Sequence, residues 1–206
     1  MARGKADPNP GLLSVPLKLM LLSHLLGDIH QPLHMDLHDD FGGNVYYVTF
    51  LGNSTCWGSR CNIHKVWDSM MMDHVITQKY GTRSFNETGD DPREAKMAAY
   101  IKTKMELMFN YTDGVAPREV ATPSKWSATT LLMGSMAYLN PMGFNVDDRY
   151  ISLAMPLVER QIYVAGYALA ASLNFIFDND GTTCEYCTFW HDLCTPQADW
   201  QLPESC

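Results

Sequence analysis

The chain has 206 residues, of which 46% are hydrophobic and 18% charged, and its formal net charge is -8 at neutral pH. This length suits one domain with a substantial core, and the composition is that of a globular rather than a disordered protein. The acidic balance argues against a protein that grips duplex DNA through Lys and Arg. It still allows a phosphate site in which metal ions supply the positive charge. No apolar run reaches the length of a membrane span.

The spacing of apolar residues predicts a mainly α-helical fold. The first helix is expected over residues 12–31, with Pro16 in its first turns and Pro32 at its end. Pro92 opens a later helix, Ser124 is a suitable cap for another, and Pro156 predicts a kink or break in the last. The expected later helices cover residues 64–74, 93–109, 126–139 and 150–177.

The remaining segments predict one small β element and several loops in a single domain, 1–206. Residues 44–51 are rich in β-branched and aromatic side chains between turn residues, which predicts a strand that suits one half of a hairpin. Loops are expected at 52–61 and 77–91, and the tail 178–206 is loop-like and cysteine-rich. The residues expected to pack in or against the core are Met70, Met71, Met72, Tyr46, Tyr47 and Phe50.

Two predicted helices each carry a His/Asp pair at helical spacing. His24 and Asp28 are four residues apart, as are His64 and Asp68, so the members of each pair share a helix face. His34 follows the break at Pro32, where the chain can turn back toward the first pair. Imidazole and carboxylate are good zinc ligands, so two such pairs in an apolar context predict a metal cluster.

The ordinary reading of one such pair is a surface helix contact worth a few tenths of a kcal/mol. It is the repetition of the pair that favours metal binding. The other histidines lack this placement. His30 is expected beside the ligands or at the surface, and His38 is expected to be solvated. His74 and His191 have no partner that the sequence identifies.

The segments HLLGDIHQPLH, GGN (42–44) and NIHKVWD occur in an order that resembles the class I zinc-dependent single-strand nuclease and 3′-nucleotidase family, of the mung-bean-nuclease type. Trp126 and the segment 149–174 are similar to the distal part of that family, so the resemblance covers roughly residues 12–177. It implies a multi-helix domain of the phospholipase C/nuclease type, with a small β-hairpin and three zinc ions in a cleft.

The resemblance also implies the roles of individual residues. His24 and Asp28 would bind one zinc of a close pair, with Asp28 bridging to its neighbour, while the ligands of the remaining zinc would be His34, His64 and Asp68. Asn44 matches a position that hydrogen-bonds a nucleobase. The expected substrates are single-stranded DNA or RNA and 3′-nucleotides, cleaved to 5′-phosphate ends. The nucleophile would be a zinc-activated water, with no protein side chain as catalyst.

The family's further ligands lie upstream of the matched motifs and have no counterpart in this chain. We therefore expect an N-terminally incomplete domain, here its C-terminal two-thirds, which forms about one complete zinc site, acts as a monomer and shows little activity alone. Two other functions remain open. One is a zinc-dependent phospholipase C, which shares the broad fold, and the other is a non-catalytic secreted zinc-binding protein.

Sequons and cysteines predict a secreted or secretory-pathway protein, with a lysosome-like lumen as another suitable compartment. The candidate glycosylation sites are Asn53, Asn86 and Asn110. Cys56 and Cys61 are close enough to close a short loop as a disulfide, with free buried thiols as the alternative. The other four cysteines suit two more bridges or a zinc site with His191; they are Cys184, Cys187, Cys194 and Cys206. A signal peptide would lie upstream of Met1.

Overall fold

The structure, a computed structural model, describes residues 14–85, 89–109 and 123–177, and it is mainly helical as predicted. Its helices and strands are α1 (Val15–Asp28), η1 (Pro32–His34), β1 (Thr49–Phe50), β2 (Thr55–Cys56), β3 (Ser59–Arg60), α2 (Ile63–Lys65), η2 (Val66–Met70), α3 (Met71–Tyr80), α4 (Pro92–Phe109), α5 (Pro123–Leu131), η4 (Gly134–Tyr138), β4 (Asn145–Val146) and α6 (Asp148–Phe177). In the part of the chain that is described, no helix combines the length and apolar character that a membrane crossing requires.

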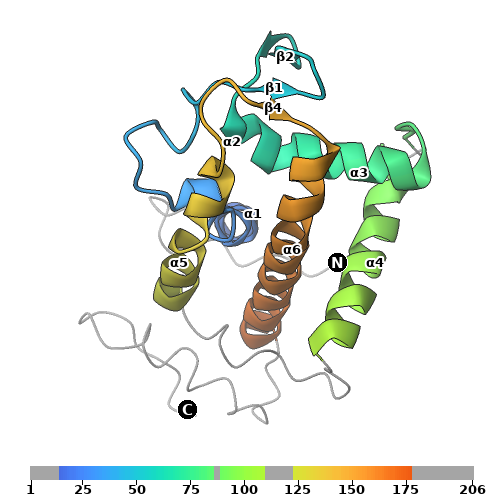
Figure 1. Cartoon of the computed structure of the whole chain (residues 1–206). Helices are drawn as coiled ribbons and strands as arrows, with labels where there is room; N and C mark the ends of the chain where they lie inside the picture. The colour runs from blue at the N-terminus through green and yellow to red at the C-terminus, as the bar shows by residue number, and fades with distance from the viewer. Residues whose placement is uncertain (1–13, 86–88, 110–122, 178–206) are drawn as a thin grey trace.

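The long helix α6 is the centre of the molecule (Figure 1). It packs against α1 on one side and α4 on the other, while α3 crosses near its N-terminal end. α6 begins at Asp148 and continues past Pro156, so of the two predicted alternatives, a kink or a break, the break is wrong. The carboxylate of Asp147, just before α6, accepts a hydrogen bond from the backbone N–H of Tyr150, and this bond fixes the start of the helix.

Most of the core lies between α6, the helix formed by α2, η2 and α3, and the short strands. Its buried members include Ile63, Val66, Met71, Val146 and Tyr150. Within this core Trp67 donates a hydrogen bond to the Tyr150 hydroxyl, which in turn donates to the carbonyl of Ala137. Met71 is fully buried with Met70 and Met72 packed around it, which confirms that the methionine run is core packing.

Three of the predicted helices end or divide differently in the structure. α1 ends at Asp28, and a separate 3₁₀ turn, η1, carries the chain from Pro32 to His34. The second predicted helix begins at Ile63 and continues to Tyr80 through the π-helical turn η2, so it includes the start of the predicted polar loop. The helix predicted at 126–139 is interrupted, because α5 ends at Leu131 and η4 follows.

The strand predicted over residues 44–51 is wrong for most of its length. Only β1 is regular, and it pairs in parallel with β4, nearly 100 residues later, rather than with a hairpin partner. The hairpin lies instead in the predicted loop, where β2 and β3 pair antiparallel. The Cys56–Cys61 disulfide closes this hairpin, as one of the two alternatives predicted. The tail cysteines, His191, Asn86 and Asn110 lie outside the described residues.

Candidate metal centre

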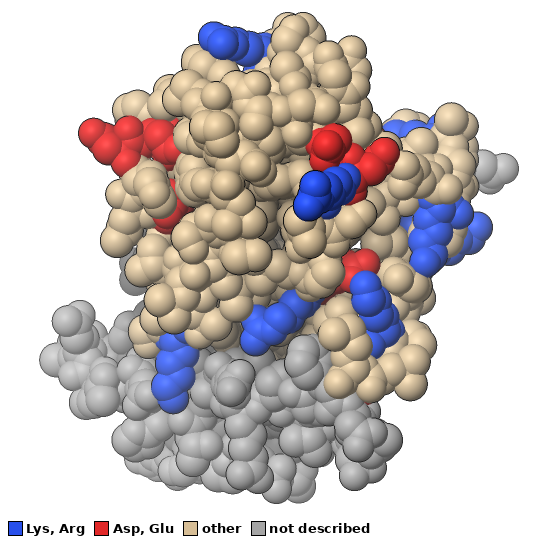
Figure 2. Space-filling view, in the orientation of Figure 1, with Lys and Arg blue, Asp and Glu red and all other residues tan. Residues whose placement is uncertain are grey.

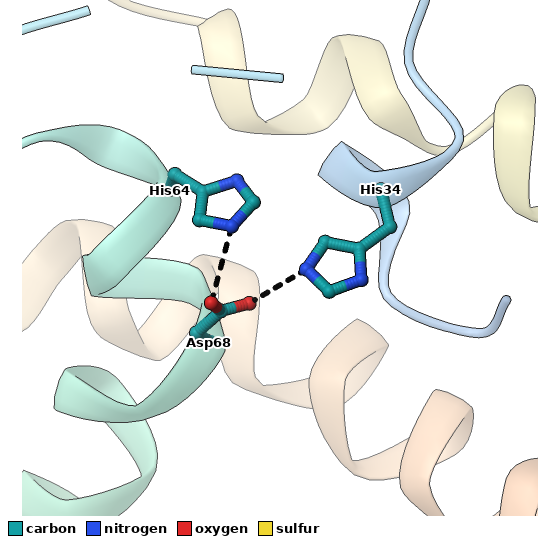
Figure 3. A group of neighbouring side chains, drawn as sticks. All are labelled: His34, His64 and Asp68. Carbon is teal, nitrogen blue, oxygen red and sulfur yellow. Dashed lines mark ion pairs between the residues drawn. The ribbon is translucent and has the colours of Figure 1, made fainter. Parts of the chain in front are cut away.

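Three elements bring the predicted ligands together. Asp28 is the last residue of α1, His34 ends the turn η1, and the helix that starts at α2 carries His64 and Asp68 one turn apart. Figure 3 shows His34 and His64 pointing at the Asp68 carboxylate from two sides. The Nε2 atom of each imidazole lies 3.2 Å from one of the two carboxylate oxygens. The two rings are stacked, with 5.0 Å between their centroids.

The donor set of His34, His64 and Asp68 fits a zinc ion. One ligand atom from each residue lies within 4.8 Å of the others. In a tetrahedral zinc site neighbouring ligand atoms are about 3.3 Å apart, because zinc–ligand bonds are about 2 Å long. Small rotations of the three side chains would bring their ligand atoms from within 4.8 Å of one another to this tetrahedral spacing. In the described residues no other group of three His, Cys, Asp or Glu side chains converges in this way.

The hydrogen bonds of His64 leave the correct nitrogen available for a metal. Its Nδ1 lies 2.7 Å from the carbonyl oxygen of Gly42. A carbonyl only accepts, so Nδ1 must carry a proton, and Nε2 is the nitrogen that can lose its proton and offer a lone pair to a metal beside Asp68. Metal-binding histidines commonly donate their second N–H to a backbone carbonyl in this manner.

Gly42 and Gly43, which precede Asn44, explain why the loop backbone can lie so close to His64. A Cβ atom on Gly42 would lie 2.5 Å from the carbonyl oxygen of Leu33, and one on Gly43 would lie 2.5 Å from the Ile63 side chain. Both residues also have positive φ angles, which glycine adopts at little cost. The two glycines of the GGN motif therefore allow close contact between this loop, the turn of His34 and the helix of His64.

Asp28 links this group to the second predicted set. One of its oxygens lies 3.5 Å from Nδ1 of His34, and the other lies 3.3 Å from Nε2 of His24. The His24 side chain is 71% exposed, so this pair is far more open than the group around Asp68. Among the described residues the pair has no third ligand, and it forms only part of a site.

The group lies between two hollows of similar size. One, of about 660 Å³, is bordered by Asp28, His34 and His64 together with Leu25 and the exposed Phe41. The other, of about 680 Å³, contains all five predicted ligands and has an apolar wall formed by Trp67, Met72, Val158, Ile162 and Ala165. A ligand in either hollow can therefore reach His34 and His64, and a ligand in the second hollow can also reach Asp68.

The other predicted site residues have mixed outcomes. His30 is 3% exposed, so the surface alternative is wrong; it lines the second hollow, and its Nδ1 lies 2.7 Å from the Leu26 carbonyl oxygen. His38 is more than half exposed, as expected, although it also pairs with Asp36. His74 pairs with Asp148 at 3.0 Å, a partner that the sequence did not identify because it lies 74 residues away. Asn44 is exposed, and its side chain donates to the carbonyl of Phe41.

The sequence model of the S1/P1 nuclease family matches residues 14–178. The chain belongs to this family. Nuclease S1 of Aspergillus oryzae is 31% identical over 166 residues, which cover 77% of this chain and 53% of the relative. Among the Arabidopsis thaliana proteins, Endonuclease 4 is 31% identical over 163 residues (78% and 50%), and Endonuclease 3 is 30% identical over 162 residues (77% and 51%).

The chain therefore spans about half the length of these curated relatives. The matched region contains every described helix and all five predicted ligands. Membership of the S1/P1 nuclease family thus agrees with the resemblance carried by the two His/Asp motifs, and with the mainly helical fold.

Proposed function

We propose that the protein takes part in zinc-dependent hydrolysis of phosphodiester bonds in single-stranded DNA or RNA and of 3′-nucleotides, giving 5′-phosphate ends. The observation that carries this proposal is the convergence of His34, His64 and Asp68 between two hollows in a member of the S1/P1 nuclease family. Zinc bound there supplies Lewis-acid stabilisation of the negative charge on a phosphoryl group.

The chain's own residues hold the ligands in place before a metal arrives. The Gly42 carbonyl fixes the tautomer of His64, and Asp28 lies near Nδ1 of His34, so both imidazoles direct Nε2 toward Asp68. Such preorganisation reduces the reorganisation that metal and substrate binding would otherwise require. We propose that Asn44, whose side chain is hydrogen-bonded to the Phe41 carbonyl, contacts a nucleobase that stacks on the exposed Phe41 ring at the border of the first hollow.

The charge distribution supports recognition through metal rather than through a basic surface. Figure 2 shows Lys and Arg side chains at separate places on this face, several of them directly beside Asp or Glu side chains. The net charge of -8 likewise gives no general attraction for a polyanion. Bound ions would then be the main positive charges that a phosphate meets.

The number of ions follows from the ligand count. The group of three leaves a position open for water or phosphate, as catalytic zinc sites do, so we propose about one firmly bound zinc in this chain. The complete enzyme would hold three. His24 and Asp28 would contribute to the second position, and the further ligands would come from residues outside this chain. We therefore propose that this chain, as a monomer, has little nuclease activity alone.

A zinc-dependent phospholipase C is the second candidate, because the wall formed by Val158, Ile162 and Ala165 offers apolar surface beside the ligands. A non-catalytic zinc-binding protein is the third. Two versions separate them: the 206-residue chain, and a form with an added N-terminal segment carrying the ligands that the family resemblance implies. Each is assayed with zinc on single-stranded DNA, on duplex DNA and on phosphatidylcholine vesicles.

We expect the extended form to release acid-soluble nucleotides from the single strand in preference to the duplex, and to lose this activity with a zinc chelator. Replacing Asp28 with Asn in that form should be among the most damaging single changes. Lipid hydrolysis without nucleotide release would favour the phospholipase. Inactivity of the extended form on every substrate, with zinc bound, would favour the non-catalytic protein.

We further propose a secreted or secretory-pathway location. The Cys56–Cys61 disulfide and the exposed sequon at Asn53 support this. When the protein is secreted from eukaryotic cells, glycosidase treatment should lower its apparent mass, and the Asn53→Gln variant should show a smaller shift. An unchanged mass in both would count against the proposed location.

A further inference from the structure

Gln31 connects two parts of the candidate metal centre that are distant in the sequence. It immediately precedes Pro32, which disfavours helical backbone at the preceding residue, and it is extended with φ -83° and ψ 119°. Its side-chain carbonyl accepts the backbone N–H of Leu33 at the start of the turn that carries His34. Its amide Nε2 donates to Oδ1 of Asp68 at 2.7 Å, across 37 residues of sequence.

The two bonds fix the orientation of the Gln31 amide. A backbone N–H only donates and a carboxylate only accepts, so the amide oxygen must face Leu33 and the NH₂ group must face Asp68. The backbone beneath it is also held, because the carbonyl of His30 accepts a hydrogen bond from the buried side chain of Gln161 on α6. Gln31 is thus a fixed donor rather than a mobile surface side chain.

We propose that Gln31 is a positioning residue for the metal centre, which holds the Asp68 carboxylate in register with His34 by bridging Asp68 to the turn η1. Because Gln31 occupies one position on Oδ1, it restricts the ways in which the carboxylate can coordinate. This inference rests on the proposed zinc site. It adds a residue that carries no ligand atom but sets the geometry of one, and such partners typically change metal affinity about 10- to 100-fold.

Asn62 provides a matched control, because its side-chain amide makes the same two kinds of hydrogen bond close to the same centre, although Asn62 is the more buried of the two. Its side-chain oxygen accepts the backbone N–H of Lys65 at the start of the helix that carries His64, and its amide donates to the carbonyl of Asn44. Replacing either amide with Ala removes one helix-start bond and one amide donor. Only Gln31 directs its donor at a ligand.

The experiment measures zinc affinity by competition with a chromophoric chelator, together with the visible absorption of the Co²⁺-loaded chain, which reports coordination geometry. The proteins are the unchanged chain, Gln31→Ala, Gln31→Met and Asn62→Ala, each with its unfolding free energy measured. Met preserves length at position 31 and guards against simple loss of packing. We expect zinc affinity to fall about tenfold or more in both Gln31 variants, with an altered cobalt spectrum. Asn62→Ala should stay close to the unchanged chain in both readouts.

Equal loss of affinity in Asn62→Ala would mean that general stability, not positioning, explains the effect. Unchanged affinity or an unchanged cobalt spectrum in a folded Gln31→Met variant would also overturn the inference. These outcomes differ from failure of the zinc site itself, in which the unchanged chain would bind neither ion.

Discussion

Asp68 is the residue on which the candidate centre depends. Burial by itself would raise the pKa of its carboxyl, but hydrogen bonds from His34, His64 and Gln31 outweigh burial and hold that pKa well below its usual range. The same contact acts on the partner, because the hydrogen bond to Asp68 raises the pKa of His64 above 6.5. The metal-free centre is thus arranged around a charged carboxylate and an imidazole that retains its proton to higher pH.

This arrangement predicts opposite pH dependences for stability and metal binding. In the metal-free chain, the raised pKa of His64 contributes stability that is present below its unfolded value, about 6.5, and is lost as pH rises through the folded value. Zinc requires the unprotonated imidazole, so affinity should increase over the same interval. Chemical unfolding with a chelator present and zinc titrations, both between about pH 5.5 and 8.5, test this. Zinc affinity that is constant across the interval would contradict it.

At this scale the sequence predicts which side chains converge, but not the groups that hydrogen-bond to those side chains and orient them. The i,i+4 spacing places His64 beside Asp68 without reference to anything else in the fold. The carbonyl of Gly42 and the amide of Gln31 are visible only once the loop, the turn and the helix are in contact. The sequence leaves His30 either beside the ligands or at the surface, and the buried position that excludes the surface is seen only in the fold, where Gln161 of α6 hydrogen-bonds the His30 carbonyl.

At the scale of elements, local signals identify helices and long-range pairing sets the rest. Pro92 begins α4 as predicted, because a proline lacks the N–H that a first helical turn leaves unused. The strands follow no local signal, since β1 is two residues long and its partner β4 comes nearly 100 residues later. A run of β-branched residues cannot reveal such a pairing.

The Tyr150 hydroxyl joins α6 to the η2 turn and to η4, and its removal should weaken both contacts. Tyr150→Phe leaves the Trp67 N–H and the Ala137 carbonyl without this partner, which should cost about 1–3 kcal/mol of unfolding free energy at neutral pH. Chemical denaturation of both proteins measures the difference. Equal stability would show that neither bond contributes.

The dependence of the unfolding free energy on alkaline pH gives a second test of Tyr150. Burial raises the pKa of Tyr150 from 10.0 to about 12, although the hydrogen bond from Trp67 opposes this. The neutral phenol is therefore favoured in the folded state, and its contribution should be lost as pH rises from about 10 toward 12. The stability difference between the unchanged chain and Tyr150→Phe should shrink over that range.

The hairpin β2–β3 depends on its disulfide. Cys56 and Cys61 are five positions apart and both are buried in the main core. Closing so short a loop should contribute about 2 kcal/mol by the chain-entropy relation. The variant with both cysteines replaced by Ser should lose at least this much in chemical unfolding, and a variant as stable as the unchanged chain would exclude a stabilising role.

At the scale of the whole molecule, the fold serves to hold one loop, one turn and one helix against each other. α6 fixes α1 and the residues before η1, while the main core fixes the helix of His64. The helix α1 buries only one side chain, Leu26, in the structure. Several of its apolar residues are exposed, among them Val15, Met20 and Leu25. The group of His34, His64 and Asp68 is therefore the most completely assembled part of the candidate metal centre.

The most direct test of the central claim is the zinc content of the folded chain after dialysis, measured by elemental analysis. By its ligand count the unchanged chain should retain about one zinc. His64→Ala/Asp68→Ala should retain almost none. The control His74→Ala/Asp148→Ala removes a different His–Asp pair, away from the centre, and should retain as much as the unchanged chain. A folded chain without zinc, or full retention by His64→Ala/Asp68→Ala, would contradict the assignment of His34, His64 and Asp68 as a metal site.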